Sequence, residues 1–529
     1  MEFVTPFSQW LQSEGSFALG AAVVAAAVCT VVLYRGMGHS QDPKDPPLVP
    51  YTIPWLGSGL AFAGDFNKFM KWIRKVMPPE VPYRIYMGGR TLYFITSPRL
   101  YAKVVRISKT MSFDLLEREI FIKIFEMEKG DLENFCIGMQ GMPPPSNMTQ
   151  EQADEIAFAP RFMKHYHDNW YSQTEGLEFS SNKFSFEWAK HLQSIVGDKD
   201  EVTVSLRTLI EHHFFWSGTT VHFGSRLQDV APDMAEQLWQ FEEGFLKLFQ
   251  DHPRWLLSGA LKARDQIIVG LEKWIALAEE KAPAASLSDD LIWEEYWGSI
   301  VLRQRVKMLE DRGFSLNSKA LHQFGLLWAL SANTIPVVQW ILIYILRNPE
   351  VLPRLREEAA TAISFEPTLT IDWKTLTNLP LFLSVYREAL RLTVSNMTAR
   401  VVIDDTEVEG YVLKKGHMLI APSQALHMSP VFDHPSHPVN EFWAERFMVE
   451  GLERSKLLNS WRPFAGGTTY CTGRYLAAGE IFSTVGMLLL KYDMKLEERN
   501  GPIKYSPGRT GTSAIRPDRD GSIILTKRH

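Results

Sequence analysis

The stretch RPFAGGTTYCTGRYLAAGEI, residues 462–481, places a cysteine between two turns of small residues and ahead of a run favourable for helix. The sulfur of Cys471 is therefore expected at or just before a helix N-terminus. Unpaired backbone N–H groups and the positive end of the helix dipole stabilise negative charge there and lower the pKa of a thiol. The position favours a thiolate, although an isolated cysteine is more often a buried structural residue.

The residues around this cysteine form a spaced pattern. Gly466 and Gly467 let the preceding backbone fold under a bulky group. The pattern F-x-x-G-x-x-x-C-x-G is matched by Phe464, Gly467, Cys471 and Gly473. It resembles the loop by which cytochrome P450 enzymes hold heme iron. The resemblance implies that Cys471 is the metal ligand and that the other three residues of the pattern bind the cofactor.

Two further positions concern the propionate groups of such a heme. The family commonly has Arg or His two residues before the cysteine, where this chain has Thr469. Arg400, nine residues after Arg391, stands where the family commonly keeps an arginine for a propionate. The resemblance therefore implies a cofactor-binding role for Arg400, and the alternative is an ordinary strand arginine.

A charged pair in YREALRL resembles another element of the family. Glu388 and Arg391 lie one helical turn apart, so both side chains project from one face. Such a pair is usually a solvated surface salt bridge. In the family it is buried and joined to an arginine of a later P-E-R-F segment, and FWAERF offers Arg446, with Ala444 in place of the proline. The resemblance implies a structural clamp of these three charged residues.

The segment WALSANTIPVVQW, residues 328–340, lies in the longest stretch expected to be helical. Pro336 has no N–H, so the carbonyl of Ala332 loses its helical partner and the helix should bend or open. In the wider family an acid–Thr pair at this place relays protons, and here the pair aligns as Asn333–Thr334. The resemblance implies that Thr334 hydrogen-bonds oxygen or water and that Asn333 positions water, because an amide cannot ionise. The alternative is a polar pair that caps a kink.

These likenesses together imply a heme-thiolate monooxygenase with heme b (iron protoporphyrin IX) as cofactor. A thiolate ligand favours O–O cleavage, so one atom of O2 is expected to enter a C–H bond of a lipophilic substrate. The sequence carries no flavin or NADPH motif, so the family implies electrons from NADPH-cytochrome P450 reductase, docking near Arg462 and Arg474. Two alternatives stay open: a heme-thiolate isomerase or dehydratase, and a heme or lipid binder without catalysis.

The A-N-T-I-P sequence at residues 332–336 looks like the P450 group that contains cholesterol 7α-hydroxylase, sterol 12α-hydroxylase and prostacyclin synthase. This likeness implies a sterol substrate, but a fungal-type terpenoid of secondary metabolism would need the same apolar cavity. Residues 130–310 offer no motif of the family. The substrate and the position of oxidation therefore stay open.

The amino-acid composition bears on which binding partners the protein has and on whether its compartment is reducing or oxidising. The chain has 529 residues, of which 45% are hydrophobic, and can bury a large core. Its net charge is -5, and the sequence has no long basic run and no stretch in which aromatic and basic residues alternate. These features argue against nucleic acid as a binding partner. The cysteines Cys29, Cys136 and Cys471 are too few for a disulfide framework, which suits a reducing compartment.

Residues 15–34 carry no charge and have about the length of a bilayer-spanning helix. A buried core helix or a cleaved signal peptide is the alternative, but no basic region precedes the segment. Arg35 and Lys44 follow it, so the positive-inside rule puts the rest of the chain in the cytosol. With the resemblance, this predicts a single-pass protein of the endoplasmic reticulum membrane with a cytosolic catalytic domain.

The expected domain order is an N-terminal segment (1–14), a transmembrane anchor (15–34), a Pro-rich hinge (35–56) and a catalytic domain (57–529). Five prolines within residues 43–54 favour an extended, stiff hinge.

Secondary structure is expected to be mostly helical. Strand patterns occur in residues 83–97, 398–422 and 522–527. Long segments with apolar faces include residues 233–251, 288–312, 317–347 and 381–392. The fold class is therefore mainly α, with the resemblance implying the cytochrome P450 fold: a large helical domain with small β-sheets, preceded by an N-terminal transmembrane helix.

Overall fold

The structure is a computed structural model, and it describes residues 23–26, 28–29, 42–51, 53, 56–64, 66–157, 174–288, 290–506, 511 and 514–528. The predicted anchor lies outside these residues apart from 23–26 and 28–29, and so does the first part of the predicted hinge. Among the described residues, one helical stretch, 316–347, has the length and apolar character needed to cross a membrane. Because 78% of its most apolar window is buried inside the protein, it is a core helix.

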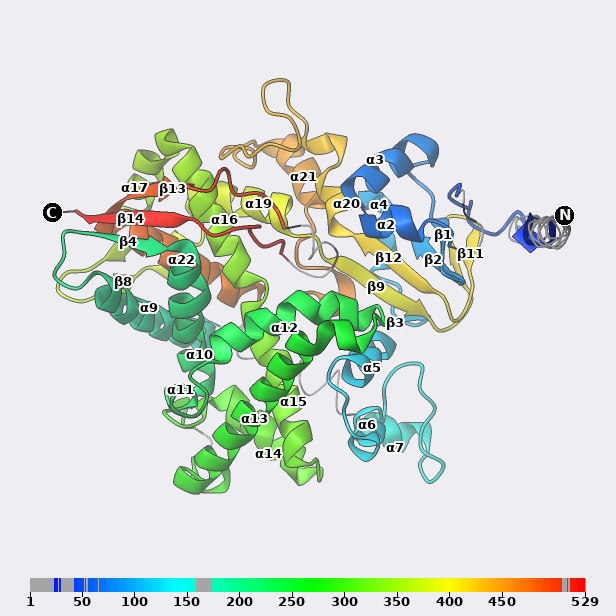
Figure 1. Cartoon of the computed structure of the whole chain (residues 1–529), viewed down its shortest axis with the longest axis horizontal. Coiled ribbons are helices and arrows are strands. Elements are labelled where there is room, and N and C mark those ends of the chain that lie inside the picture. The colour runs from blue at the N-terminus through cyan, green and yellow to red at the C-terminus, as the bar shows by residue number, and fades with distance from the viewer. Residues whose placement is uncertain are drawn as a thin grey trace, which may run out of the picture. The chain divides into compact units, whose positions relative to one another are not determined.

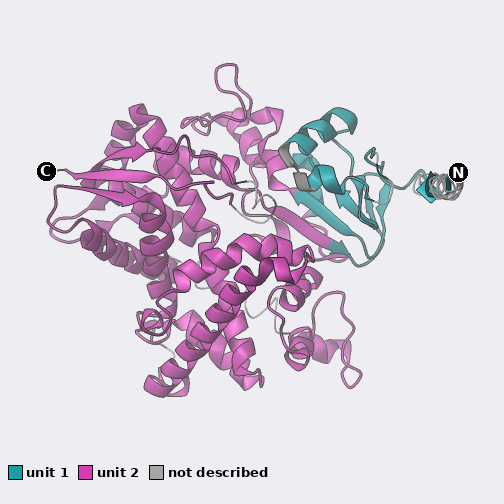
Figure 2. Ribbon diagram, viewed as in Figure 1, with its two compact units in different colours: residues 1–104, 401–421 teal, residues 105–400, 422–529 magenta. Residues whose placement is uncertain are grey.

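The chain divides into two compact units, coloured in Figure 2. Unit 1 comprises residues 1–104 and 401–421, and unit 2 comprises residues 105–400 and 422–529. In unit 1, β1 pairs antiparallel with β2, and β12 pairs parallel with β2. The elements of unit 1 are α2 (Gly59–Gly64), α3 (Phe66–Val76), β1 (Tyr83–Met87), β2 (Arg90–Phe94), α4 (Pro98–Val104), β10 (Thr406–Val408), β11 (Tyr411–Leu413) and β12 (Met418–Pro422), whose last residue belongs to unit 2.

Unit 2 is mainly helical. Its helices up to the main core helix are α5 (Asp114–Lys123), α6 (Lys129–Phe135), α7 (Gln150–Glu155), α9 (Thr174–Val196), α10 (Phe215–Phe223), α11 (Leu227–Val230), α12 (Met234–Phe249), α13 (Ser258–Lys281) and α14 (Ile300–Asp311). The later helices are α15 (Leu316–Ser331), α16 (Thr334–Arg347), α17 (Leu352–Ala360), α18 (Trp373–Leu376), α19 (Pro380–Thr393), α20 (Ser423–His427), α21 (Gly451–Ser460) and α22 (Arg474–Lys491).

The strands of unit 2 are few and short. β14 (Ser522–Lys527) lies between β13 (Tyr492–Glu497) and β4 (Glu201–Ser205) in a three-stranded antiparallel sheet (Figure 1). Two hairpins are formed by β5 (Trp293–Glu294) with β6 (Gly298–Ser299) and by β7 (Ile363–Ser364) with β8 (Thr370–Ile371). β3 (Met111–Ser112) is a two-residue strand, and β9 (Met397–Val402) crosses the boundary between the units.

The core of unit 2 is built on α15 and α16. α13 packs against both α12 and α15, while α16 packs against α19 and α22. Every residue of α16 from Thr334 to Ile345 is buried, which is why the run TIPVVQWILIYI carries apolar residues on all sides of the helix. This helix therefore brings together the segments that carry the predicted site residues.

Several sequence predictions agree with the structure. Residues 83–97 contain β1 and β2, residues 398–422 contain β10 to β12 and all of β9 except Met397, and residues 522–527 are β14. Residues 233–251 and 381–392 are helical as α12 and α19. The expected opening near Pro336 is present, because α15 ends at Ser331 and α16 begins at Thr334.

The prediction of a helix over residues 288–312 is wrong in its first half. The hairpin β5–β6 precedes α14, and Gly298 in it has φ +72°. A Cβ at Gly298 would lie 2.3 Å from the backbone nitrogen of Gly224, so the turn is set by tertiary packing that periodicity does not reveal.

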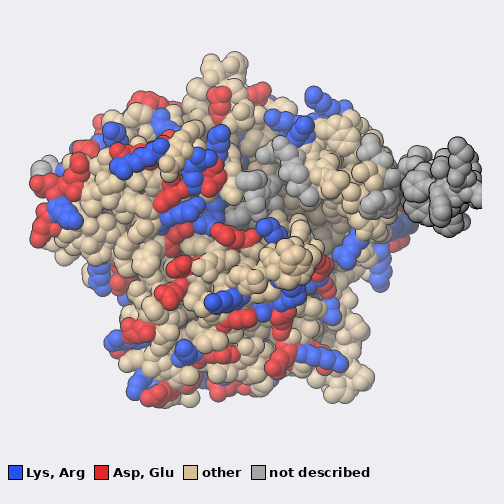
Figure 3. Space-filling model, viewed as in Figure 1, with Lys and Arg blue, Asp and Glu red and all other residues tan. Residues whose placement is uncertain are grey.

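The surface carries mixed charge. On the face shown in Figure 3, Lys and Arg side chains are interspersed with Asp and Glu side chains. Ion pairs in unit 2 such as Arg356–Asp493, at 2.9 Å, contribute to this mixture.

Candidate active site

The Cys471 loop connects α21 to α22. The N–H of Cys471 donates to the carbonyl oxygen of Phe464 at 3.0 Å, and the N–H of Tyr470 donates to that of Gly467 at 3.3 Å. The ring of Phe464 packs edge-on against Trp461, with centroids 5.9 Å apart. These contacts close the loop and hold Cys471 just before the first residue of α22, as the sequence predicts.

The two glycines of the pattern differ in backbone conformation and in the space available for a side chain. Gly467 has φ +67°, and a Cβ there would lie 1.9 Å from the carbonyl oxygen of Val105, so no other residue fits. Gly473 has φ -79°, and a Cβ there would meet no described atom within 4 Å. Open space therefore adjoins the backbone two residues after Cys471.

Opposing influences act on the thiol of Cys471. Hydrogen bonds from the backbone N–H groups of Gly473 and Arg474 and the charge of Arg474 lower its pKa, but burial acts in the other direction and is larger. The pKa of the Cys471 thiol is therefore raised. The expectation of a lowered pKa is wrong for the thiol by itself, because desolvation outweighs the donors at the helix end. A metal ion that binds such a thiol deprotonates it.

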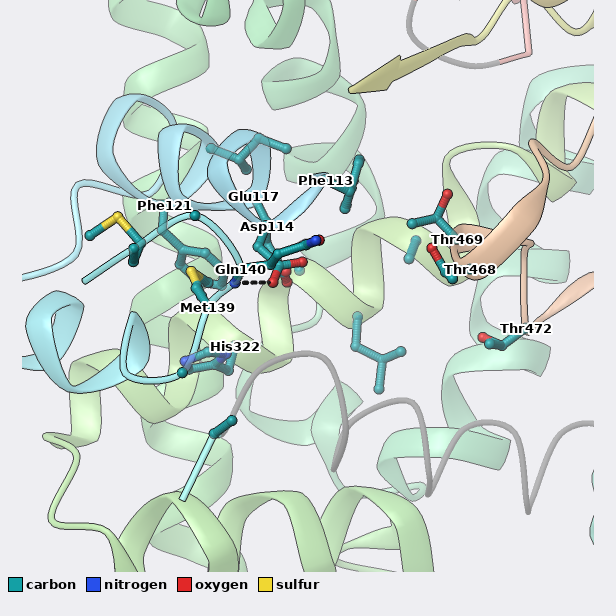
Figure 4. A pocket seen from close by; sticks show the side chains of 18 of the residues that line it. Phe113, Asp114, Glu117, Phe121, Met139, Gln140, His322, Thr468, Thr469 and Thr472 are labelled. Atoms are coloured by element: carbon teal, nitrogen blue, oxygen red, sulfur yellow. Dashed lines mark hydrogen bonds between the residues drawn. The ribbon is translucent and has the colours of Figure 1, made fainter. Parts of the chain in front are cut away.

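A cavity of about 1360 Å³ lies in unit 2, and Cys471 forms part of its wall. Figure 4 shows Thr469 on the side of the cysteine loop, with Phe121 and His322 on the opposite side. Pockets for a single drug-sized ligand measure roughly 300–1,000 Å³. The cavity is thus large enough for a cofactor and a substrate together.

Arg400 reaches the cysteine loop from β9. Its guanidinium donates to the hydroxyl of Thr469 and, at 3.3 Å, to the carbonyl oxygen of Gly466. Thr469 lines the cavity, while the buried Arg400 stands behind it. Thr469 stands where the family usually has Arg or His, and its hydroxyl is hydrogen-bonded to the guanidinium of Arg400.

The three charged residues predicted as a clamp meet in the interior. Glu388 pairs with Arg391 at 2.7 Å and with Arg446 at 2.9 Å, and no side chain of the three is more than 2% exposed. Arg391 also donates to the carbonyl of Val439 at 2.7 Å, and Arg446 to that of Glu441 at 3.0 Å. The ion pairs are thus supplemented by backbone acceptors that satisfy the remaining guanidinium hydrogens.

Asn333 and Thr334 lie at the opening between α15 and α16. The side-chain oxygen of Asn333 accepts a hydrogen bond from the N–H of Ala514 at 3.0 Å. Thr334 is buried, and neither residue belongs to the described lining of the large cavity, which includes Trp328 and Ala329 one turn earlier. Asn333 therefore ties the helix opening to the segment around Ala514, a contact that the sequence did not suggest.

Comparison with known proteins places this loop and clamp in a family. A family model described as "Cytochrome P450" matches residues 187–519, which is more than half of the chain. The chain belongs to the cytochrome P450 family. The P450 family implies a heme-thiolate cofactor, O2 and an electron-transfer partner.

Similar P450 proteins extend over nearly the whole chain. "Cytochrome P450 monooxygenase efuG" of Hormonema carpetanum is 26% identical over 94% of this chain and 94% of its own length. "Cytochrome P450 7B1" of Mus musculus is 25% identical over 96% and 95%. The human "7-alpha-hydroxycholest-4-en-3-one 12-alpha-hydroxylase" is 24% identical over 95% and 96%. The chain is a cytochrome P450 monooxygenase.

A solved structure shows the P450 fold. The chain described as "Retinoic acid bound cyanobacterial CYP120A1" superposes with a TM-score of 0.65 at 18% identity, covering 92% of this chain and 99% of that one. This similarity is evidence of a mainly helical P450 fold with small sheets.

The residues present fit a heme. A thiol stands in the wall of a large cavity, and the open space at Gly473 adjoins it. The buried cation of Arg400 is joined to a hydroxyl that lines the same cavity. This donor set has the soft sulfur ligand and the nearby cation that an iron porphyrin with anionic propionates requires.

No motif in the sequence marks the residues on the side of the cavity opposite the cysteine loop. Asp114, Glu117, Gln140, Arg305 and His322 line the cavity there. The segment DLLEREIFIK of α5 reads as an ordinary charged surface helix, because its acids and bases alternate without a motif. No local signal could have identified these residues, since they meet only in the folded chain.

Proposed function

We propose that this P450 hydroxylates or otherwise oxidises a lipophilic sterol- or terpenoid-like substrate, using O2 and electrons from NADPH. The observation that carries this proposal is the position of Cys471 in the wall of a cavity of about 1360 Å³. Apolar side chains such as Phe125, Met139 and Phe245 contribute to the lining. Similar proteins include a 7-alpha-hydroxycholest-4-en-3-one 12-alpha-hydroxylase, which supports a polycyclic substrate. The A-N-T-I-P segment supports the same group.

In this proposal Cys471 is the thiolate ligand of heme b, and Phe464, Gly467 and Gly473 shape the loop that holds it. Arg400, with Thr469, holds a propionate. Bound through a thiolate, heme supplies oxygen activation and insertion into a C–H bond. The protein contributes the ligand, a cavity that excludes water and a path for protons.

Thr334 is proposed to hold a hydrogen-bonded water or oxygen at the helix opening. Asn333 keeps the opening in place through its bond to Ala514 and cannot itself supply a proton. Protons must therefore arrive through water or other side chains, with the Thr334 hydroxyl as the positioning group.

The proposed electron donor is NADPH-cytochrome P450 reductase, and the proposed location is the endoplasmic reticulum membrane, with residues 15–34 as a single-pass anchor and a cytosolic catalytic domain. Arg474 stacks between Tyr470 and Tyr475, at 4.5 and 4.2 Å from their ring centroids. Both tyrosines are exposed, so this cation adjoins the surface next to the cysteine loop and suits an acidic partner.

The spectrum of the reduced protein with carbon monoxide tests the thiolate. We expect wild type to show the heme-thiolate absorbance and Cys471→Ser to lose it. Cys136→Ser is the matched control, because Cys136 is buried beside α6 and does not line the cavity. An unchanged spectrum in Cys471→Ser would overturn both the ligand assignment and the proposed reaction.

Turnover of a panel of sterols and terpenoids tests the reaction. Product formation should require both NADPH and reductase, and Thr334→Ala should keep substrate affinity while slowing product formation by about 10²-fold or diverting electrons from product. Product that forms equally well without NADPH and reductase would instead indicate an isomerase or dehydratase. Binding with no turnover of any compound would indicate a binder.

A further inference from the structure

The cavity has a polar region on the side opposite the cysteine loop. Asp114 and Glu117 come from α5, Arg305 from α14 and His322 from α15. Figure 4 shows Asp114 and Glu117 beside Gln140, with Thr468, Thr469 and Thr472 across the cavity. The cavity therefore has polar side chains at one end and the thiol of Cys471 on the other side, and apolar side chains contribute to the rest of its wall.

Several polar groups in this region are already engaged. The N–H of Gln140 donates to Oδ2 of Asp114 at 2.8 Å, and the side-chain amide of Gln140 donates to the carbonyl of Lys109 at 3.2 Å. Arg305 donates to the side-chain oxygen of Gln323 at 3.2 Å and to the carbonyl of His322 at 3.0 Å. These bonds fix the frame of the region.

Glu117 differs from these neighbours. Its carboxyl is half-buried, lines the cavity and makes no hydrogen bond or ion pair with any residue that the structure describes. Burial and the nearby Asp114 raise the pKa of Glu117 to about 7, while Arg305 acts in the opposite direction. A half-buried carboxyl that lines the cavity without a hydrogen-bond partner can pair with a ligand, and a bound ligand that covers it without supplying a partner would leave it unsatisfied.

We propose that Glu117 binds a hydroxyl group of the substrate, carried on the apolar skeleton at the end remote from the carbon that is oxidised. This inference rests on the proposed function and assigns Glu117 as a specificity-determining residue. A hydroxyl can donate to a carboxylate and accept from a carboxylic acid, so it pairs with Glu117 in either protonation state. The charge of Asp114 is opposed by Arg400 and that of Glu117 by Arg305, so the region favours a neutral polar group over a cation or an anion.

Binding of the hydroxyl at Glu117 would determine which carbon of the substrate is oxidised. A rigid skeleton held by its hydroxyl at Glu117 presents a fixed carbon on the side of Cys471, and the distance between hydroxyl and oxidised carbon becomes a property of the substrate. Removing the hydroxyl leaves Glu117 unpaired in the complex, which penalises the deoxygenated analogue more than the lost contact alone.

Matched ligand pairs test this. The dissociation constants of cholesterol and cholest-5-ene, and of abietadienol and abietadiene, are measured by equilibrium dialysis and by the substrate-induced absorbance change of the heme protein. Wild type should bind the hydroxylated member of at least one pair about tenfold more tightly. Glu117→Leu should bring that ratio close to one, whereas Glu117→Gln, which keeps a hydrogen-bonding group, should keep most of it.

The control is Glu119→Leu, because Glu119 lies on the same helix and is not among the residues that line the cavity. A change of cavity shape alone would move the affinities of both members of a pair together and leave their ratio unchanged. If the ratio of the two dissociation constants in Glu117→Leu is the same as in wild type, the inference is overturned. The proposed function still holds in that case if oxidation of the substrate depends on NADPH. Failure to bind any of the four compounds contradicts the substrate class and the inference with it.

Discussion

Glu388 binds two arginines at once in a part of unit 2 that excludes water. Each of the three side chains has almost no exposed surface, so each charge depends on the others and on backbone carbonyls for its partners. Placing charges in such a site gains little over an apolar core, but removing one partner leaves another charge unpaired. The clamp therefore specifies one packing of α19 against the segment that carries Arg446.

Replacement Glu388→Gln should destabilise the protein by about 3–5 kcal/mol, because two buried guanidinium groups lose their counter-charge. Urea unfolding at constant pH measures the change. The control Glu497→Gln removes the partner of Arg499, whose side chain is 73% exposed, and should cost less than about 1 kcal/mol. Equal urea midpoints for Glu388→Gln and Glu497→Gln would show that the clamp contributes no more to stability than a surface ion pair.

The clamp illustrates what sequence can and cannot give at the scale of residues. The spacing of Glu388 and Arg391 places them on one helix face, but only the likeness to a known family distinguishes this pair from a surface salt bridge. Glu117 had no such likeness, and its charged helix reads as solvated. Chemistry that arises where distant segments meet is not visible in either segment.

Among the elements, the cysteine loop is held in its shape by backbone conformation. Ala465 and Gly467 both have positive φ, +57° and +67°, on either side of the extended Gly466. Only Gly467 also touches the backbone of Val105 closely enough to exclude a Cβ. An alanine in such a conformation is uncommon, so the surrounding contacts must compensate its strain.

Replacement Gly467→Ala should destabilise the protein by more than about 2 kcal/mol and reduce heme content, because the new Cβ strikes a carbonyl oxygen in a left-handed conformation. Gly473→Ala should leave the stability of the heme-free protein within about 0.5 kcal/mol, since the added methyl meets no described atom. Thermal unfolding with and without heme separates the two. A loss of heme-free stability in Gly473→Ala comparable to that in Gly467→Ala would contradict this account.

Element boundaries were predictable where a single residue dictates them. The missing N–H of Pro336 predicts the interruption between α15 and α16, and it occurs one turn earlier as expected. The hairpin that replaces the start of the helix expected over 288–312 depends on the contact of Gly298 with Gly224, which lies far away in sequence. The bond from Ala514 to Asn333 is equally non-local.

At the scale of the whole molecule, several histidines that are fully or partly buried resist protonation. Burial lowers the pKa of His427 and His322 to about 3 and that of His213 to about 4. For His427 the charges of Arg391 and Arg462 act in the same direction as burial. The unfolded chain therefore binds more protons than the folded chain below about pH 6.5, so stability falls as the pH is lowered through that range.

His427 should account for about 2 kcal/mol of this loss at pH 5. His427→Gln removes the titration and can still accept from the N–H of Arg462, which donates to Nε2 of His427 at 2.9 Å. Urea midpoints measured at pH 7.5 and pH 5 should therefore differ less in the variant than in wild type. An identical pH dependence in both proteins would mean that this histidine is not kept neutral by folding.

The three-stranded sheet of unit 2 couples distant parts of the chain. Its middle strand, β14, pairs Ile523 with Val204 on one side and with Leu496 on the other. Such high contact order delays closure of the sheet until long loops are fixed, so the helices are expected to collapse first. If the chain were cut between β13 and β14 and β14 then dissociated, β13 and β4 would each be left with an unpaired edge, which favours aggregation.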